Sequence, residues 1–460
     1  MEPREVDVVV IGLGPGGEAL ATQLAKAGLD VVGVDRRLVG GECPYFGCIP
    51  TKMIVRAAEV LAEGRRVPDL AGSSEVRADW APVATRIRTE ATDDWNDSAA
   101  VERFEAAGGH FLRGQGRISA PGEVTVATKT GEQVLVVRKG IVLNPGTEPA
   151  VPPIEGLADT PYWTNRDAVR AEQAPGSLIV LGGGPIGLEF AQAFARFDTN
   201  VTVLEAGPAI LGPSEPEAAK LLTDVLTREG LTVRTGVHAS SVTHDGDHFT
   251  VTIDDGEGVT GDRLLVSAGR YTDLPGLGIA NVGLDDTARS IPTDNRMRAA
   301  DGVWVIGDVA GHGAFTHLSM YHSRIAATDI LGTGDETAAY HAVPSVTFTD
   351  PEVGQVGLTE QGARQKGIQV RTGMTDVPST TRGWIHKSGN DGLIKVVEDV
   401  DRRVLVGATV VAPAGGEILG ALTVAVHAQV PTTLLRQMIY VYPTIHRGIE
   451  TALADLDNED

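Results

Sequence analysis

The chain has 460 residues, which is too many for one hydrophobic core and indicates about three domains. Its 39 lysines and arginines stand against 61 aspartates and glutamates, and the resulting formal charge of −22 disfavours binding to nucleic-acid phosphates or anionic lipids. No apolar run approaches the ~20 residues needed to cross a bilayer, so neither nucleic acid nor membrane is expected as a partner.

The start of the chain, residues 1–7, lacks the basic segment and longer apolar stretch of a secretory signal, so a cytoplasmic location is expected. The chain has only two cysteines, Cys43 and Cys48, which cannot form a disulfide framework. In a reducing compartment, two cysteines five positions apart are more typical of a reactive pair than of a structural one.

The chain opens with the pattern of a strand, a glycine-rich turn, a helix and a second strand. The strands are predicted over Val6–Ile11 and Asp30–Val34, and the helix over Glu18–Ala27. Glycines at such a turn allow the backbone to approach a pyrophosphate at the helix N-terminus, and an acid after the second strand accepts hydrogen bonds from a ribose. The alternative is a glycine turn with only a structural role. The predicted nucleotide contacts are Gly12, Gly14, Gly17 and Asp35.

The same pattern recurs in the strand Ser177–Leu181, the helix Leu188–Phe197 and the strand Asn200–Leu204. Glu205 follows the second strand, and residues 206–210 contain no Arg or Lys to pair with a 2′-phosphate, which favours NADH over NADPH. The alternative is that Glu205 is a surface acid and that either nucleotide serves. The predicted NAD contacts are Gly182, Gly184, Gly187, Glu205 and, after the later strand Arg263–Val266, Gly269.

Proline- and glycine-rich joints at 144–149 and 151–156 indicate a crossover between domains near residue 150, and a second joint follows residues 267–270. From about Pro344 the pattern changes to strands, such as Leu393–Val397 and Val404–Val411, followed by helices. This pattern predicts an α+β tail domain.

Cys43 and Cys48 lie in the segment Gly40–Lys52, behind a pair of glycines. A helical pattern begins at about Cys48, and a helix N-terminus lowers the pKa of a thiol, which favours a persistent thiolate. The alternative is an inert disulfide or two buried thiols.

This cysteine segment, both glycine motifs, the pair Gly307 and Asp308 and the tail segment Pro344–Pro351 resemble the flavoprotein disulfide reductases, the group of dihydrolipoamide dehydrogenase, glutathione reductase and mercuric reductase. The resemblance covers essentially the whole chain. It implies an α/β fold with two Rossmann-like dinucleotide-binding domains, for FAD and NAD, plus a C-terminal α+β dimerisation domain. The implied bounds are 1–150 and 271–340 for the FAD domain, 151–270 for the NAD domain and 341–460 for the interface domain of a homodimer.

The resemblance also implies roles for single residues. Cys48 would lie against the flavin as a charge-transfer donor and Cys43 would attack the acceptor, while Lys52, paired with Glu189, would place positive charge beside the flavin. An ordinary salt bridge is the alternative for that pair. The further FAD contacts that it implies are Gly41, Lys52, Gly307, Asp308 and His317. No metal site is predicted, since no Cys or carboxylate cluster accompanies the histidines near residue 317.

The tail departs from the His-Pro-x-x-x-Glu pattern of the disulfide-reducing members, because Tyr442 stands in the histidine position and Arg447 in the glutamate position. An imidazole, with an ordinary pKa near ~6.5, exchanges protons at neutral pH, whereas a phenol near ~10 is mostly a donor. His446, four residues on, would share a face with Tyr442 if the segment were helical, and would then take over the proton role. The alternative is a surface or packing histidine.

The predicted function is electron transfer from NAD(P)H through FAD to a Cys43–Cys48 disulfide and on to a disulfide or another small acceptor. Direct flavin chemistry with accessory cysteines remains an alternative, as in a quinone reductase, a transhydrogenase or a mercuric reductase. Mercury reduction is not favoured, because the chain lacks extra tail cysteines. A nucleotide-sensing flavoprotein without catalytic activity is the alternative outside enzymes.

Overall fold

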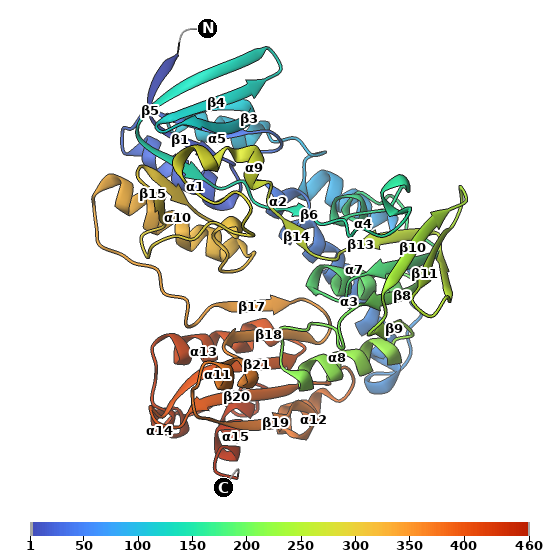
Figure 1. The fold of residues 1–460 in the computed structure, drawn as a ribbon. Helices are drawn as coiled ribbons and strands as arrows, with labels where there is room; N and C mark the ends of the chain where they lie inside the picture. Colours follow the sequence, from blue (N-terminus) through green and yellow to red (C-terminus); the bar gives the residue numbers. More distant parts are fainter. Residues whose placement is uncertain (1–2, 459–460) are drawn as a thin grey trace. The chain divides into compact units, whose positions relative to one another are not determined.

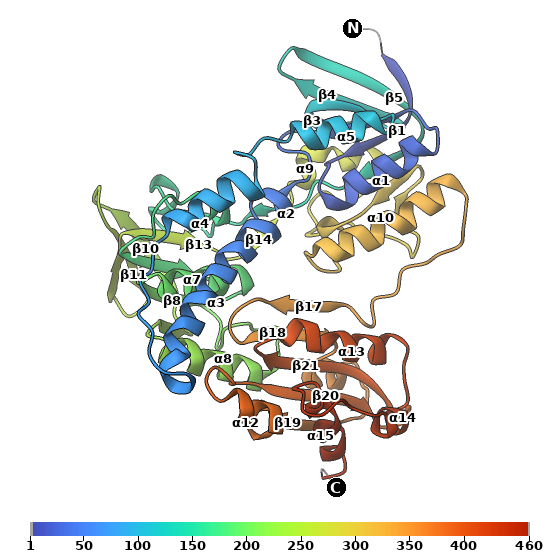
Figure 2. The same ribbon diagram turned by 180° about the vertical axis from the view of Figure 1, so that it is seen from behind.

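The computed structural model, drawn as a ribbon in Figures 1 and 2, describes residues 3–458. The contacts within the chain divide it into two compact units. Unit 1 comprises Met1–Pro50, Thr85–Ala150 and Arg270–Ala339, and unit 2 comprises Thr51–Ala84, Val151–Gly269 and Tyr340–Asp460. Among the described residues, no helix is both long and apolar enough to cross a membrane.

A parallel sheet forms the centre of unit 1, with its strands in the order β3-β2-β1-β5-β16. Their carboxyl ends meet at one edge, where open α/β sheets bind their ligands. The antiparallel strand β4 joins β3 to β5, and β15 pairs with β16 at the other side. The bounds are β1 Arg4–Ile11, β2 Val31–Asp35, β3 His110–Ala120, β4 Glu123–Thr128, β5 Gly131–Leu143, β15 Arg298–Ala300 and β16 Val303–Val305.

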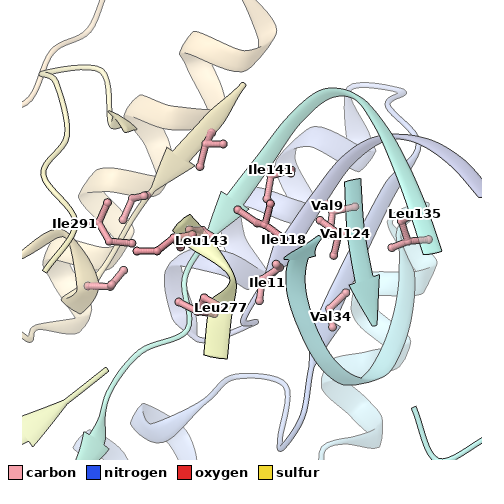
Figure 3. Close-up of a cluster of buried hydrophobic side chains, with 14 of the residues drawn as sticks. Val9, Ile11, Val34, Ile118, Val124, Leu135, Ile141, Leu143, Leu277 and Ile291 are labelled. Carbon is pink, nitrogen blue, oxygen red and sulfur yellow. The ribbon is translucent and has the colours of Figure 1, made fainter. Parts of the chain in front are cut away.

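The strands of unit 1 bury branched apolar side chains in one continuous core (Figure 3). Val9, Ile11, Val34 and Leu143 come from the parallel strands, and Leu277 and Ile291 complete the cluster. Such β-branched and aliphatic runs are typical of strands that are covered on both faces.

Helices α1 and α10 lie side by side in both views (Figures 1 and 2). They approach closely at Gly16, where an added Cβ would lie 2.2 Å from Ser319 Oγ. The helices and short elements of unit 1 are α1 Pro15–Lys26, α2 Glu42–Tyr45, the π-helix η1 Ile87–Ala91, α5 Ser98–Ala106, β6 Glu148–Pro149, β14 Arg270–Tyr271, α9 Leu274–Leu277, η3 Ile279–Val282, η4 Asp308–Ala310 and α10 Thr316–Leu331. Two further helices, α3 Cys48–Leu70 and α4 Ala81–Arg86, contain residues of both units.

The middle of the chain contributes a second parallel sheet to unit 2, in the order β13-β7-β8-β9, and an antiparallel sheet of β10, β11 and β12. The two sheets share one core, in which Leu181, Phe249 and Leu264 are buried. The bounds are η2 Leu157–Asp159, α6 Asn165–Val169, β7 Ser177–Leu181, α7 Pro185–Arg196, β8 Asn200–Glu205, α8 Pro216–Arg228, β9 Thr232–Thr235, β10 Ala239–His244, β11 Phe249–Ile253, β12 Gly258–Gly261 and β13 Arg263–Val266.

The tail of unit 2 is an antiparallel sheet in the order β17-β18-β21-β20-β19, against which α13 and α15 pack. Every residue of β20 and β21 is buried. The bounds are β17 Pro344–Thr347, β18 Glu352–Gly357, α11 Glu360–Gln365, β19 Val370–Asp376, η5 Val377–Ser379, α12 Thr381–His386, β20 Leu393–Asp399, β21 Val404–Ala412, α13 Gly415–His427, α14 Thr432–Gln437 and α15 Gly448–Asp455.

The predicted α/β fold, with two nucleotide-binding domains and an α+β tail, is confirmed. The strands Ser177–Leu181 and Arg263–Val266 have the predicted bounds, whereas α7 begins at Pro185, three residues earlier than expected. That proline is favourable in the first helical turn, because it lacks the N–H that would have no partner there.

Candidate functional site

The glycines of the first glycine turn have two different roles: some are required for close backbone packing, and one leaves space for a ligand. Gly12 has φ +94°, and an added Cβ would lie 2.0 Å from Asn144 O, while a Cβ on Gly17 would lie 2.1 Å from Gly12 O. A Cβ on Gly14 would meet only Asn144 Nδ2, at 3.4 Å. Gly12 and Gly17 are therefore required by the fold itself, and Gly14 leaves room for a ligand to approach the backbone, as a pyrophosphate does.

The second glycine turn repeats this division in unit 2. A Cβ on Gly182 (φ +107°) would lie 2.5 Å from Ser267 O, and a Cβ on Gly187 would lie 2.3 Å from Gly182 O. A Cβ on Gly184 would meet nothing within 4 Å. Gly269 has φ +112° in the turn after β13. Both turns thus fit a dinucleotide by the same criterion.

Each predicted ribose acid is bound to its own glycine turn. Asp35 accepts hydrogen bonds from Leu13 N at 2.8 Å and from Arg37 N at 2.7 Å, and burial raises its pKa above 3.8. Glu205 accepts from Gly183 N and Gly207 N, both at 2.6 Å. In both turns, the amide that donates follows the first glycine, so each carboxylate is fixed beside the ligand edge of its sheet.

Gly307 and Asp308 follow β16 and lie at the same edge as the first glycine turn. Gly307 has φ +76°, and its N–H donates to Nδ1 of the buried His322 at 3.1 Å. Asp308 accepts from Thr147 Oγ1 at 3.1 Å, and burial raises the pKa of its carboxyl.

Asn144, at the end of β5, was not predicted as a site residue. Its Nδ2 donates to Gly12 O at 3.2 Å, and its Oδ1 accepts from Ser319 Oγ at 3.2 Å. A Cβ on Gly307 would lie 2.7 Å from the same Oδ1. Asn144 therefore connects the first glycine turn and Gly307 with α10. The available sequence signal was a polar residue directly after a buried strand, at the edge where ligands bind.

The cysteine pair lies at the start of α3 and in the short helix before it. Cys48 is the first residue of α3, as predicted, and its Sγ lies 3.4 Å from Oγ1 of Thr316, the first residue of α10. Its sulfur is therefore near the positive ends of two helix dipoles, an environment that favours a thiolate. Cys43, in α2, is half-buried, and Cys48 is exposed.

The residues around the two cysteines fit this arrangement. Gly41 has φ +68°, and a Cβ there would lie 2.9 Å from Gly14 Cα, so the cysteine segment packs on the glycine turn. Tyr45 and Phe46, between the cysteines, are buried and pack in the interior. His317, the second residue of α10, stacks on Phe315 with ring centroids 5.1 Å apart.

Lys52 and Glu189 form the ion pair expected from the resemblance, with 2.6 Å between Nζ and Oε2. Glu189 is buried and its Oε1 accepts from Phe348 N at 2.9 Å, while Lys52 Nζ lies 4.5 Å from the centre of the Phe348 ring. The carboxylate and the ring thus hold the ammonium group in place. A role of this pair beside a flavin stays a prediction.

The tail residues lie in the segment between α14 and α15. The Arg447 guanidinium lies 5.1 Å from the Tyr442 ring centre, and its Nε donates to Glu450 Oε2 at 2.9 Å. His446 Nδ1 lies 3.0 Å from Thr444 Oγ1. The segment is not helical, because α15 begins only at Gly448, so the idea of a shared helical face for Tyr442 and His446 is wrong.

An open groove of about 470 Å³ adjoins this segment. It is lined by Met438, Ile439, Tyr440, Tyr442, Arg447 and Glu450. Within residues 3–458, no group of three or more His, Cys, Asp or Glu side chains is arranged to hold a metal ion.

Comparison with known families assigns the chain. Residues 6–328 match the family described as pyridine nucleotide-disulphide oxidoreductase, and residues 343–453 match the dimerisation domain of that family. The chain belongs to this family of FAD-dependent oxidoreductases. The resemblance stated from the cysteine segment and the glycine motifs is thereby confirmed, as is the prediction of an enzyme.

The individual relatives of this oxidoreductase differ in their named activities. A dihydrolipoyl dehydrogenase of Thermus scotoductus is 32% identical over 99% of the chain and 98% of its own length. A mercuric reductase of Shewanella putrefaciens is 29% identical over 96% of the chain and 80% of its own length. The Cu(II) complex of the HOCl-induced flavoprotein disulfide reductase RclA from Escherichia coli has a TM-score of 0.86 and 26% identity, with 99% of each chain covered.

The second glycine turn yields a first prediction. Gly184→Ala should change the free energy of unfolding by less than about 1 kcal/mol, because its φ of −86° suits alanine and its Cβ meets no protein atom. The methyl group should nevertheless raise the Kd for NAD(P)H about tenfold or more, by blocking the approach of the pyrophosphate. Gly187→Ala, the matched control, should destabilise the fold by about 1–3 kcal/mol. Equal effects of both variants on stability would contradict this division of roles.

His322 yields a second prediction. Burial and the neighbouring His312 lower its pKa from 6.5 to about 4. Between these pH values the unfolded chain binds the proton more tightly than the folded chain does. The free energy of unfolding is therefore at its full value above pH 6.5 and falls as the pH falls towards 4. In His322→Asn, the new side chain keeps an acceptor for Gly307 N–H but does not titrate. Between pH 7 and pH 5, the free energy of unfolding measured with urea should therefore fall by about 2 kcal/mol more in wild type than in this variant.

Proposed function

We propose that this oxidoreductase takes electrons from NADH and delivers them, through FAD, to a disulfide between Cys43 and Cys48 and then to a small acceptor. The position of Cys48 Sγ, at the N-termini of α3 and α10, supports this route most directly. FAD, when bound, accepts a hydride from the nicotinamide and passes on two electrons. The chain itself binds both nucleotides and stabilises the thiolate.

The two sulfurs have different tasks in this proposal. Helix dipoles favour the anionic form of Cys48, so it is the better leaving group when the acceptor is reduced. Cys43 is the outer thiol that attacks the acceptor. Lys52 follows Cys48 by one turn of α3, and its pairing with Glu189 supports a role as the positive charge beside the flavin.

The choice of NADH over NADPH rests on Glu205. Its carboxylate is fixed by two backbone amides and keeps lone pairs for ribose hydroxyls. A 2′-phosphate at that position would meet this negative charge, and residues 206–210 supply no cation to neutralise it.

We also propose a homodimer, consistent with the family's dimerisation domain. The segment around the groove exposes apolar side chains, with Ile439 95% exposed, and a dimer interface there would remove them from water. The proposal places the chain in the cytoplasm, since a reactive thiol pair is typical of a reducing compartment.

A second candidate acceptor is a thiophilic metal ion. Mercuric reductases are among the relatives, and a structural relative is a Cu(II) complex. A Cys43 thiolate would bind such an ion as a soft ligand. Position 442, beside Arg447, carries a tyrosine in place of the proton-exchanging imidazole that favours a disulfide acceptor.

Replacement of Cys43 tests the electron route. Wild-type holoenzyme, titrated anaerobically with NADH, should develop the long-wavelength absorbance of a thiolate against a flavin after one two-electron equivalent. Cys43→Ser should show this band without NADH, because Cys48 then cannot form the disulfide. It should also reduce small disulfides or Hg(II) at least about 100-fold more slowly than wild type.

The controls for this titration separate the alternatives. NADPH should give the same band only at higher concentration. If Cys43→Ser reduces disulfides, Hg(II), Cu(II) and quinones as fast as wild type does, the dithiol route is wrong and direct flavin chemistry replaces it.

Ile439→Asp tests the dimer. A carboxylate at the centre of a buried apolar interface is costly, so this variant should sediment as a monomer where wild type is a dimer. Ile439→Leu keeps the apolar surface and should remain dimeric. A dimeric Ile439→Asp protein would exclude this face from the interface.

A further inference from the structure

A left-handed turn precedes α5 in unit 1. Asp93, Asp94 and Trp95 have φ values of 46°, 53° and 56° in succession. Residues other than glycine adopt this conformation at an energetic cost, because the Cβ crowds the following carbonyl oxygen. Three successive residues of this kind persist only where the surrounding structure determines them.

Backbone hydrogen bonds enclose the turn. It follows the π-helix η1, whose carbonyl groups accept from Thr92 N (Ile87 O, 3.0 Å) and Asp94 N (Arg88 O, 2.7 Å). Asn96 N then donates to Thr92 O at 3.2 Å. These bonds hold the backbone of the turn, and thereby aim the side chain of Trp95.

That side chain reaches the segment between the two cysteines. Trp95 Nε1 donates to Tyr45 O at 3.2 Å, in the four-residue helix α2 that contains Cys43. Two residues further on, the buried Asp97 accepts from Val39 N at 2.7 Å. We call residues 39–48 the redox loop, so the loop is held before the cysteines by Asp97 and between them by Trp95.

Arg113 fixes Asp97 in turn, since its Nη2 donates to Asp97 Oδ2 at 2.6 Å. A helix of four residues is too short to be stable alone, so α2 depends on contacts from outside for its geometry. The indole N–H supplies such a contact at the peptide between the two sulfurs.

We propose that Trp95 is a positioning residue for the Cys43–Cys48 pair, acting through the Tyr45 carbonyl to hold the redox loop ready for disulfide formation. This inference rests on the proposed function in taking the pair as redox-active. Preorganisation raises the effective concentration of one thiol at the other, and so stabilises the disulfide relative to the dithiol.

The test measures the thiol–disulfide equilibrium of the holoprotein in glutathione buffers, under anaerobic conditions, with alkylation and mass spectrometry to count thiols. Two glutathione thiols reduce the protein disulfide to two thiols and leave as one glutathione disulfide, so two electrons and two protons reach the protein. Trp95→Phe keeps an aromatic ring but removes the N–H. It should shift the equilibrium constant towards the dithiol by about three- to tenfold, or about 15–30 mV.

Trp80→Phe is the matched control. Trp80 Nε1 also donates to a backbone carbonyl, Ala171 O at 2.7 Å, and its ring stacks on Phe194, but it belongs to unit 2, whereas the redox loop belongs to unit 1. This variant should lower the unfolding midpoint at least as much as Trp95→Phe and shift the thiol equilibrium by less than about twofold.

Equal shifts in both variants, or no shift in Trp95→Phe, would overturn the proposal, as would a wild-type pair that forms no disulfide in any buffer.

Where Trp95→Phe folds poorly, Asp94→Gly is added to both arms, because glycine adopts the φ of 53° without strain. A wild-type pair that NADH does not reduce would refute the proposed electron route, while the glutathione equilibrium would still report on Trp95.

Discussion

The close approach of Gly12 to Asn144 is the constraint on which the rest of unit 1 depends. The carbonyl group of Asn144 occupies the space that any side chain on Gly12 would need, and its amide side chain bonds to Gly12 O and Ser319. This contact joins the ends of β1 and β5 to α10, and the first residue of α10 in turn contacts the sulfur of Cys48. The position of the Cys48 sulfur, and with it the proposed electron route, therefore depends on packing at the glycine turn.

The two nucleotide sites reach the same geometry with different residues. In unit 2, Ser267 Oγ donates to Leu181 O and Gly182 O. It thus satisfies the carbonyl group of the first glycine, as Asn144 does in unit 1, with a shorter side chain. Both turns leave one glycine open and fix an acid through the amide after the first glycine. The repeated feature is thus the backbone arrangement, and the supporting side chains are free to differ as long as they satisfy the same carbonyl groups.

The features that could be predicted from the sequence are those encoded within one short segment. The glycine turns, their acids and the start of α3 at Cys48 follow from local spacing. The pairing of Lys52 with Glu189, 137 positions apart, came only from the family resemblance, and the bond between Thr147 and Asp308 spans 161 positions without a local signal. The turn at Asp93 could not be foreseen either, because no glycine marks its positive φ values. The shared face of Tyr442 and His446 was conditional on a helix there, and Pro443 and the late start of α15 exclude one.

The two departures in the tail act as a pair. The disulfide-reducing pattern has a glutamate in the position of Arg447, and a carboxylate near a histidine favours the protonated form of the ring. Here, Arg447 lies over the face of Tyr442, an arrangement that suits a neutral aromatic ring and would repel an imidazolium. A histidine at position 442 would therefore be held neutral by its own neighbour, so the loss of the imidazole and the gain of the arginine depend on each other. This dependence separates the chemistry of the proton from that of the electrons. The cysteines and glycine turns fit the proposed electron route, and the paired tail residues support the proposal of an acceptor that needs no imidazolium.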